Sequence, residues 1–197
     1  MFFSVRTLSV FAFIAATFAT PALANSNQTT SQTQSKYPDK GQITKIFNFL
    51  GDGNYTAFLS YVAPEVSWTI MGTHPLAGQY PTRTLFTTDA LERLGNTFVV
   101  GQEASPKLVR VIGGGEEEWS VQQLHALGKC KNGLVFDNTY AWVTRWNTDG
   151  IIVEADAYLD STLIQQAITE NESIEHKYTD LRNTSMIGPV GLNCKAE

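Results

Sequence analysis

The sequence predicts an α+β protein whose helices pack on one side of a curved antiparallel sheet. Two observations support this prediction. Apolar residues recur at helical spacing early in the domain, at 39–62 and again at 84–94, whereas residues 107–159 are rich in β-branched and aromatic residues. Helices and one strand therefore come first, and a run of antiparallel strands follows. With 197 residues, the chain is long enough for one ordinary domain.

Two helices are expected at the start of the domain. Asp39 can cap the first helix. Its apolar positions are Ile43, Ile46, Phe47 and Leu50. Gly51 and Gly53 end it, and a second helix runs from about Asn54 until Pro64 stops it. One stripe of this second helix consists of Tyr55, Phe58, Leu59 and Val62.

The pattern then changes from the helical period to that of strands. Residues 65–71 (EVSWTIM) predict a strand, and residues 72–81 (GTHPLAGQYP) predict a loop. Helical spacing returns over residues 84–94. The remaining strands are expected at 107–112, 119–127, 134–146 and 151–159.

The last two strands form a hairpin. Its turn is Asn147–Gly150, which contains the Asp-Gly dipeptide that such turns favour. Asp160 or Ser161 caps a closing helix over residues 162–168. Residues 169–197 form an irregular C-terminal tail.

The first 24 residues are typical of a secretory signal peptide. Arg6 gives a short positive start, an apolar run spans residues 8–19, and Ala-Leu-Ala at 22–24 supplies a small-x-small cleavage pattern. The run is too short to cross a bilayer as a helix, which takes roughly 20 residues. We expect a secreted protein, extracellular or periplasmic, with no membrane segment in its mature form; an uncleaved anchor is the alternative. Residues 25–38 are expected to form a disordered leader.

Cysteine usage agrees with export. Cys130 and Cys194 are the two cysteines of the chain, and neither has a His or Cys nearby at metal-ligand spacing. In an oxidising compartment the pair is expected to form a disulfide that ties the C-terminal tail to the domain. Such a bond typically stabilises a protein by about 2–4 kcal/mol. Sequons that predict a glycoprotein occur at Asn54, Asn171 and Asn183.

Composition and motifs exclude several classes of function. The net charge is −5 and no basic stripe occurs, so we expect no nucleic-acid partner. The sequence contains no phosphate loop, dinucleotide fingerprint or Gly-x-Ser-x-Gly motif. The acidic run at 116–118 lacks the Asp/Gly pattern of a calcium loop. We therefore expect neither a metal ion nor a cofactor.

Two blocks of sequence resemble a known family. Residues 68–86 (WTIMGTHPLAGQYPTRTLF) and 137–164 (DNTYAWVTRWNTDGIIVEADAYLDSTLI) resemble the SnoaL-like branch of the NTF2-like superfamily. The match covers residues 39–168. It implies a cone-shaped curved sheet packed against N-terminal helices, a pocket between them, and frequent homodimers. Relatives include ketosteroid isomerase, polyketide cyclases, limonene epoxide hydrolase and non-catalytic binding modules, so the fold alone does not set the function.

Enzymes of this superfamily perform acid–base chemistry in a largely apolar pocket, where burial raises the pKa of a carboxylate. The resemblance places an acid–base Asp near the end of the last strand in cyclases and epoxide hydrolases, but Ala157 stands there in this chain. Glu154 and Asp156 alternate with Val153, Ala155 and Ala157, so they are expected on the opposite, solvated or dimer-facing side of the sheet.

His74 is the candidate catalytic base. It precedes a proline, as the resemblance places the base Asp of ketosteroid isomerase, and an imidazole titrates near neutral pH. The alternative is a loop histidine that hydrogen-bonds the backbone and shapes the turn. Tyr80 and Tyr140 are candidate catalytic donors to a carbonyl or enolate oxygen.

Four further residues are expected to line the pocket: Trp68, His125, Trp142 and Ala157. For His125 a structural role is the alternative. An aromatic stripe on one strand face is either core or the wall of a site for a flat apolar ligand. We expect a small hydrophobic or polycyclic ligand and, in an enzyme, cofactor-free isomerase, cyclase or lyase chemistry. The alternatives are a non-catalytic small-molecule binding or protein-interaction module, and a pocket filled by its own aromatics.

Overall fold

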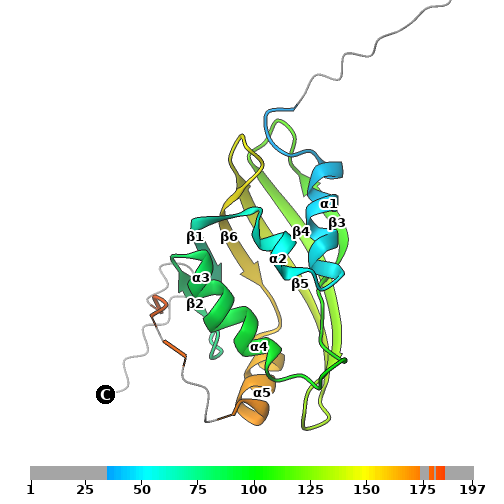
Figure 1. Ribbon diagram of the computed structural model, residues 1–197, viewed down its shortest axis with the longest axis vertical. Helices are drawn as coiled ribbons and strands as arrows, with labels where there is room; N and C mark the ends of the chain where they lie inside the picture. Colours follow the sequence, from blue (N-terminus) through cyan, green and yellow to red (C-terminus); the bar gives the residue numbers. More distant parts are fainter. Residues whose placement is uncertain (1–34, 174–177, 180, 185–197) are drawn as a thin grey trace, which may run out of the picture. The chain divides into compact units, whose positions relative to one another are not determined.

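The computed structural model describes residues 35–173, 178–179 and 181–184. Figure 1 shows these residues as one sheet with helices packed against it, which confirms the predicted α+β class. The predicted signal peptide, residues 25–34 of the predicted leader, and Cys194 lie outside the described residues. The predicted disulfide therefore stays a prediction.

The two N-terminal helices begin where the sequence predicts. Helix α1 (Lys40–Gly51) has a capping box, in which Gln42 N–H donates to the Asp39 carboxylate at 2.8 Å and Asp39 N–H donates to the Gln42 side chain at 2.9 Å. Helix α2 (Tyr55–Leu59) begins at Asn54, whose side chain accepts from Ala57 N–H at 3.1 Å. It ends earlier than predicted because Val62 already belongs to the first strand.

Six strands form a single sheet in the order β2-β1-β6-β5-β4-β3. They are β1 (Val62–Ile70), β2 (Gly78–Tyr80), β3 (Lys107–Gly113), β4 (Trp119–Lys129), β5 (Val135–Trp146) and β6 (Ile152–Tyr158). Strands β1 and β6 pair in parallel, so the sheet is mixed, whereas the sequence predicted antiparallel strands only. The remaining pairs are antiparallel. Strand β2 lies in the segment predicted as a loop, and it is defined by its pairing with β1 (Trp68 beside Tyr80).

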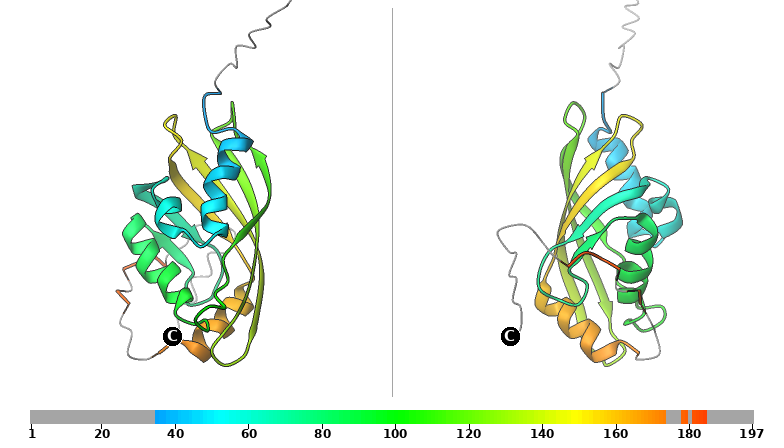
Figure 2. Two further views of the ribbon diagram at one scale, coloured as in Figure 1. Left: turned by 45° about the vertical axis from the view of Figure 1, so that its right-hand side comes forward. Right: turned by 90° about the vertical axis from the view of Figure 1, so that its left-hand side faces the viewer.

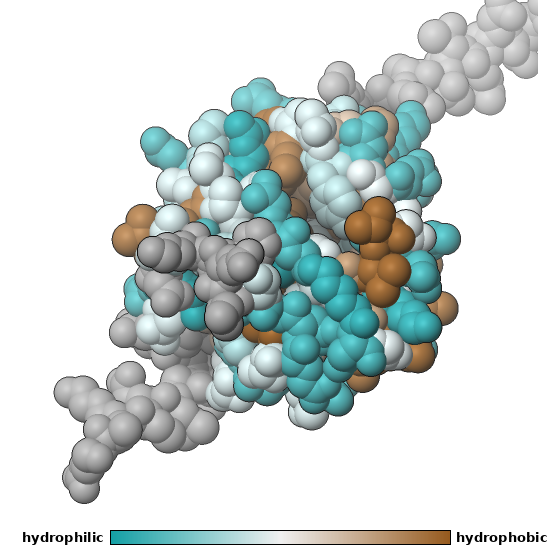
Figure 3. Space-filling model, turned by 60° about the horizontal axis from the view of Figure 1, so that its bottom comes forward, coloured by the Kyte–Doolittle hydropathy of each residue, from teal (hydrophilic) through white to brown (hydrophobic). Residues whose placement is uncertain are grey.

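The helices cover one face of this sheet, as Figures 1 and 2 show. Strand side chains alternate between the covered, inner face and an outer face. The inner face supplies much of the core, including Leu124, Ala126, Phe136, Tyr140, Trp142, Trp146, Ala155 and Ala157. On the outer face, Leu127, Val135 and Tyr158 are exposed. Figure 3 shows the lower end of the molecule, where hydrophilic residues predominate and hydrophobic ones form small, separate patches.

The helical segment after β2 contains a π-helix. Helix α3 (Arg83–Phe86) continues into η1 (Thr87–Glu92) and then α4 (Arg93–Gly95). The sequence predicted one regular helix over this segment. Single π-helical turns inside α-helices occur frequently at functional sites. Asp89 of η1 is buried and accepts hydrogen bonds from the hydroxyls of Thr88, at 2.9 Å, and of Thr179.

Helix α5 (Ser161–Asn171) closes the domain and is longer than predicted. The described residues beyond it contact the domain. Asn183 and Gln79 exchange two backbone hydrogen bonds of 2.8 Å, next to β2. Arg182 Nε donates to the Ala77 carbonyl at 3.1 Å. Parts of the predicted irregular tail thus have defined contacts with the edge of the sheet.

The described end of the predicted leader also contacts the domain. Tyr37 N–H donates to the Gly115 carbonyl at 2.8 Å, and Gly115 N–H donates to the Pro38 carbonyl at 2.9 Å. Among the described residues, none of the helices combines the length and apolar character needed to cross a membrane.

The three candidate glycosylation sites differ in exposure. Asn54 and Asn183 are exposed, whereas Asn171 is half-buried. The Asn171 side chain accepts from Asn132 N–H at 2.7 Å and donates to the Ala167 carbonyl at 3.0 Å. Glycosylation remains a prediction for all three, and at Asn171 a glycan would compete with these two bonds.

Candidate functional site

A cavity of about 350 Å³ lies between the inner face of the sheet and the helices, within the usual size range of small-molecule sites. Its deep wall is buried and almost wholly apolar. The deep lining includes Trp68, Ile70, Leu76, Phe86, Tyr140, Trp142, Ala157 and Ile164. Exposed lining residues mark the mouth; they are Thr56 of α2, Glu92 of η1, Gly95 of α4, and Glu103 of the loop before β3.

Four of the predicted site residues line this cavity. Trp68, Trp142 and Ala157 were expected as pocket residues, and Tyr140 as a catalytic donor. The sheet brings them together because Ala157 of β6 lies beside Trp142 of β5 on one side and pairs with β1 on the other. The rings of Trp68 and Trp142 meet edge to face, with centroids 5.0 Å apart, and Trp68 also stacks on Phe86 at 4.0 Å.

His74, the predicted base, is not among the residues that line the cavity. Its Nδ1 accepts from Leu76 N–H at 3.2 Å, which assigns the ring proton to Nε2, 3.1 Å from the Met71 carbonyl. Burial is the main cause that lowers the pKa of His74. Both nitrogens are therefore engaged in a neutral ring that shapes the loop. The geometry favours this structural role, and it does not support the role of base.

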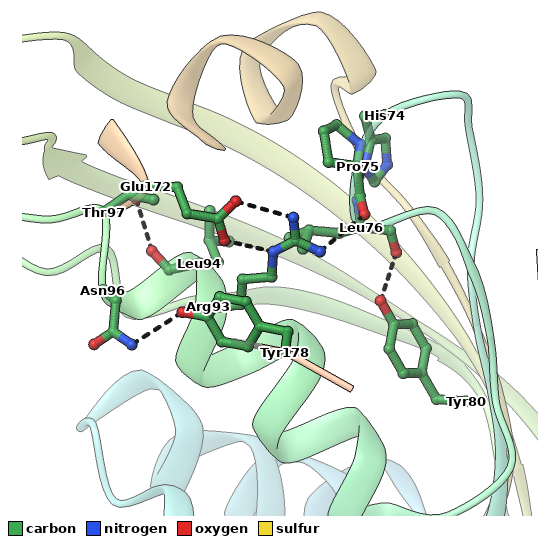
Figure 4. A network of polar contacts seen from close by, with 10 residues as sticks. All are labelled: His74, Pro75, Leu76, Tyr80, Arg93, Leu94, Asn96, Thr97, Glu172 and Tyr178. Atoms are coloured by element: carbon green, nitrogen blue, oxygen red, sulfur yellow. Dashed lines mark hydrogen bonds and ion pairs between the residues drawn. The ribbon is translucent and has the colours of Figure 1, made fainter. Parts of the chain in front are cut away.

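Tyr80 and His125 also lie outside the cavity lining. The Tyr80 hydroxyl donates to the Leu76 carbonyl at 2.8 Å, as Figure 4 shows. The prediction of His125 as a pocket residue is wrong, because its strand turns the neighbouring Leu124 inward and His125 outward. There His125 Nε2 lies 2.7 Å from Asp137 Oδ1, and the histidine side chain is 44% exposed.

Tyr140 is the polar group of the deep wall. Burial is the main cause that raises the pKa of Tyr140, and the nearby Tyr55 adds to the rise. Burial also raises the pKa of Tyr55, which lines the cavity too. Both hydroxyls therefore keep their protons at neutral pH and can donate hydrogen bonds to a ligand.

Two tryptophans of the wall carry donors that the sequence analysis did not use. The indole Nε1 atoms of Trp68 and Trp142 are buried without a hydrogen-bond partner in the part of the chain that the structure describes. The sequence predicts both rings as apolar walls of the pocket. Nothing in the sequence marks their N–H groups as unpartnered, because that depends on every neighbour in the fold.

Sequence reasoning also missed the two carboxylates at the mouth. Glu103 accepts from Gly101 N–H at 2.9 Å, and this bond is the main cause that lowers the pKa of Glu103. The Glu92 side chain makes no hydrogen bond or ion pair within the described ranges. Within the same ranges no group of three His, Cys, Asp or Glu could hold a metal ion.

A network of polar contacts joins three segments of the chain (Figure 4). Arg93 of α4 donates to both carboxylate oxygens of Glu172, at 2.6 and 2.9 Å, and to the Pro75 carbonyl at 3.3 Å. Its guanidinium lies 5.0 Å from the ring centre of Tyr178, whose hydroxyl accepts from Asn96 at 3.3 Å. The network therefore joins α4, which directly follows η1, to the His74 loop and to the segment after α5.

No protein-family model matches the chain. Two curated relatives are dimerizing cyclases. The dimerizing cyclase phiC of Fungal sp. is 33% identical over 141 residues, which are 72% of this chain and 62% of that protein. The dimerizing cyclase tstC of Talaromyces stipitatus is 30% identical over 162 residues, which are 82% of this chain and 71% of that protein. The chain therefore spans only part of the length of these relatives.

Solved structures share the fold. An NTF2-like protein of Burkholderia thailandensis E264 matches with a TM-score of 0.55 and 24% identity, over 66% of this chain and 98% of that chain. Bal32a, from a soil-derived mobile gene cassette, matches with a TM-score of 0.52 and 14% identity, over 66% of this chain and 93% of that one. At these identities the likeness shows the fold alone.

A mixed, curved sheet whose inner face is closed by N-terminal helices defines an NTF2-like fold. The match to tstC extends over most of both proteins. The chain belongs to the family that includes the dimerizing cyclases, and it has an NTF2-like fold, which agrees with its resemblance to the SnoaL-like branch of the NTF2-like superfamily.

Proposed function

We propose that the chain is a cofactor-free cyclase that closes a ring in a small, largely apolar substrate inside the cavity. The observation that carries this proposal is the cavity itself, in which Tyr140 belongs to an apolar deep wall and two glutamates lie at the mouth. The relatives named as dimerizing cyclases support the class of reaction. If the chain shares it, the cavity holds two substrate units together while an apolar wall excludes water.

The chemistry requires one carbon to become a nucleophile. Removing a proton next to a carbonyl places the electron pair on the enolate. This pair forms the new carbon–carbon bond to an alkene carbon conjugated with a second carbonyl, and the π pair of that alkene moves toward the second carbonyl oxygen as a new enolate. Glu92 is the candidate acceptor of the proton, because no donor occupies its carboxylate within the described residues. Glu103 is the weaker base, because the bond from Gly101 lowers its pKa. The proton returns to the product, so the step is redox-neutral.

Tyr140 supplies the hydrogen-bond donor that the enolate oxygen requires. Its hydroxyl stays protonated and can donate to the oxygen on which negative charge develops. A donor fixed in a water-excluded wall is worth more than one in solvent, because the surrounding dielectric is low.

A non-catalytic carrier is the second candidate. Among the described residues of the deep wall, none supplies a carboxylate or an imidazole, so the ionisable groups of the lining stand only at the mouth. A protein that only binds and carries an apolar molecule needs no ionisable group in the deep wall.

Export and self-association complete the proposal. Residues 1–24 support export through a secretory pathway. A homodimer is supported by exposed apolar side chains on the outer sheet face, Leu127, Val135 and Tyr158. Sedimentation equilibrium of the mature protein measures directly whether it forms a homodimer.

Complementation of a relative tests the proposed reaction. In a Talaromyces stipitatus strain that lacks tstC, we expect expression of this chain to restore the product that the parent strain makes, as measured by liquid chromatography and mass spectrometry. Tyr140→Phe should restore much less, whereas His125→Gln on the outer face should match wild type. A folded wild-type chain that restores no product, yet retains a small molecule from that strain, would leave the carrier function instead.

A further inference from the structure

We propose that the indole N–H groups of Trp68 and Trp142 form an oxygen-binding subsite in the cavity, and that the substrate is a neutral molecule with a carbonyl group. The inference rests on the proposed function and deepens it by naming the substrate class. Both side chains line the cavity, and both are almost completely buried, with 0% and 4% of their surface exposed.

The two tryptophans differ from the other two in the chain. Trp146 is equally buried, and its Nε1 donates to Ser120 Oγ at 2.7 Å. Trp119 is exposed. Of the four tryptophans, only the two that line the cavity bury an N–H group without a partner among the described residues, where the Asn138 amide nitrogen is a third such donor. An unpartnered buried donor destabilises the protein, and a ligand oxygen that accepts from it removes that cost.

The contact between the two rings does not supply a partner for both donors. Trp68 and Trp142 meet at 88°, with centroids 5.0 Å apart. In an edge-to-face pair, the edge of one ring meets the face of the other, so this contact engages at most one of the two N–H groups. Such an N–H to ring contact is weak and does not replace a hydrogen bond to oxygen. The two rings meet at the same wall of the cavity.

The charges of the lining residues determine which kind of ligand oxygen the cavity favours. Among the lining residues that the structure describes there is no Lys or Arg, and the charged ones are Glu92 and Glu103 at the mouth. These carboxylates oppose the entry of an anion, and an anion in the deep wall would lack a counter-charge. A neutral carbonyl oxygen has neither disadvantage. It accepts hydrogen bonds from neutral donors, and Tyr140 is a further donor on the same wall.

A pair of ligands of the same shape tests the subsite. The ketone 2-acetylnaphthalene and the hydrocarbon 2-isopropenylnaphthalene differ in having an oxygen or a CH₂ group at one position. A plain apolar cavity binds the hydrocarbon more tightly, because the ketone loses its hydrogen bonds to water. With the subsite present, we expect the ketone to bind about 10-fold more tightly than the hydrocarbon, as measured by equilibrium dialysis.

Variants assign the preference to the two indoles. Trp68→Phe and Trp142→Phe each remove one donor and keep an aromatic ring, so each should reduce the preference for the ketone, and the double variant should reverse it. Trp119→Phe on the exposed surface is the matched control and should keep the wild-type ratio. Each ratio compares two ligands on the same protein, so a general loss of stability does not produce the change. If the double variant fails to fold, the single variants carry the test.

The outcomes separate this inference from the proposed function. A wild-type protein that binds both compounds but prefers the hydrocarbon, or a ratio that the variants leave unchanged, overturns the subsite and leaves the cavity as a binding site. Binding of neither compound overturns the subsite and contradicts the proposed function as well. An infrared spectrum adds a second readout: the carbonyl stretch of the bound ketone should shift to lower frequency in wild type and recover in the double variant.

Discussion

Arg93 and Glu172 are joined by two charge-assisted hydrogen bonds, Nε to Oε1 at 2.6 Å and Nη2 to Oε2 at 2.9 Å. Arg93 directly follows η1, and Glu172 directly follows α5. The guanidinium also donates to the Pro75 carbonyl, next to Leu76 of the cavity wall. This pair therefore links the π-helix and the last helix to the loop that forms part of the site.

Removing one partner of this pair should cost stability. Glu172→Gln should lower the free energy of unfolding by about 1–3 kcal/mol, because the two side chains are only 12% and 22% exposed and Arg93 would lose its counter-charge. Glu154→Gln is the matched control. It breaks a pair with Arg145 whose side chains are 36% and 35% exposed, and should cost less than about 1 kcal/mol. Equal losses in urea unfolding would contradict the anchoring role of Arg93.

His74 should make stability depend on pH. Burial lowers the pKa of His74 from its ordinary value of 6.5, so the unfolded chain takes up a proton at a higher pH than the folded protein does. Its contribution to stability is complete above pH 6.5 and declines as the pH falls toward the folded pKa. Between about pH 7.5 and 5.5, the urea midpoint of wild type should fall. His74→Asn, which keeps an acceptor for Leu76 N–H, should fall less; equal slopes would refute this assignment.

Tyr140 should act as a neutral donor. Tyr140→Phe should reduce the rate of product formation by about 10- to 100-fold. This loss is somewhat smaller than for a sole oxyanion donor, because the two indole N–H groups of the proposed subsite also donate hydrogen bonds to the substrate. Burial raises the pKa of Tyr140, so the rate in wild type should not fall through its ionisation below about pH 10. A Tyr140→Phe variant with the wild-type rate would remove the hydroxyl from the mechanism.

The predicted disulfide is open to a mass measurement. Cys130 is buried, and burial raises the pKa of its thiol. The mature protein should weigh two hydrogens less than its reduced form and resist alkylation when unfolded without reductant. Cys194→Ser should lower the free energy of unfolding by about 2–4 kcal/mol. Alkylation of both thiols in the unreduced, unfolded protein would show that no such bond exists.

Much of the fold follows from local pattern. The capping residue Asp39 and the apolar period fix α1, and alternation along β5 and β6 puts Trp142 and Ala157 on one face. The resemblance then implied that this face lines a pocket, and Trp68, Trp142 and Ala157 are among the residues that line the cavity.

Other features depend on contacts that no local pattern records. The inner face of β4 carries the buried polar residues Ser120 and Gln122, so polarity does not reveal which side is inside, and His125 was assigned to the wrong one. The role of His74 depends on two backbone hydrogen bonds within its loop. Glu103 reaches the mouth because its loop packs near α2, which sequence spacing cannot indicate.

Closing the cavity tests the central claim most directly. Ala157→Phe places a ring in the cavity beside Trp142, and Thr139→Phe adds the same side chain on the exposed face of β5 as a control. Both are expressed at equal levels in the strain that lacks tstC, and the restored product is measured. We predict wild-type product with Thr139→Phe and none with Ala157→Phe. Undiminished product from a folded Ala157→Phe protein would contradict the claim that the reaction takes place in this cavity.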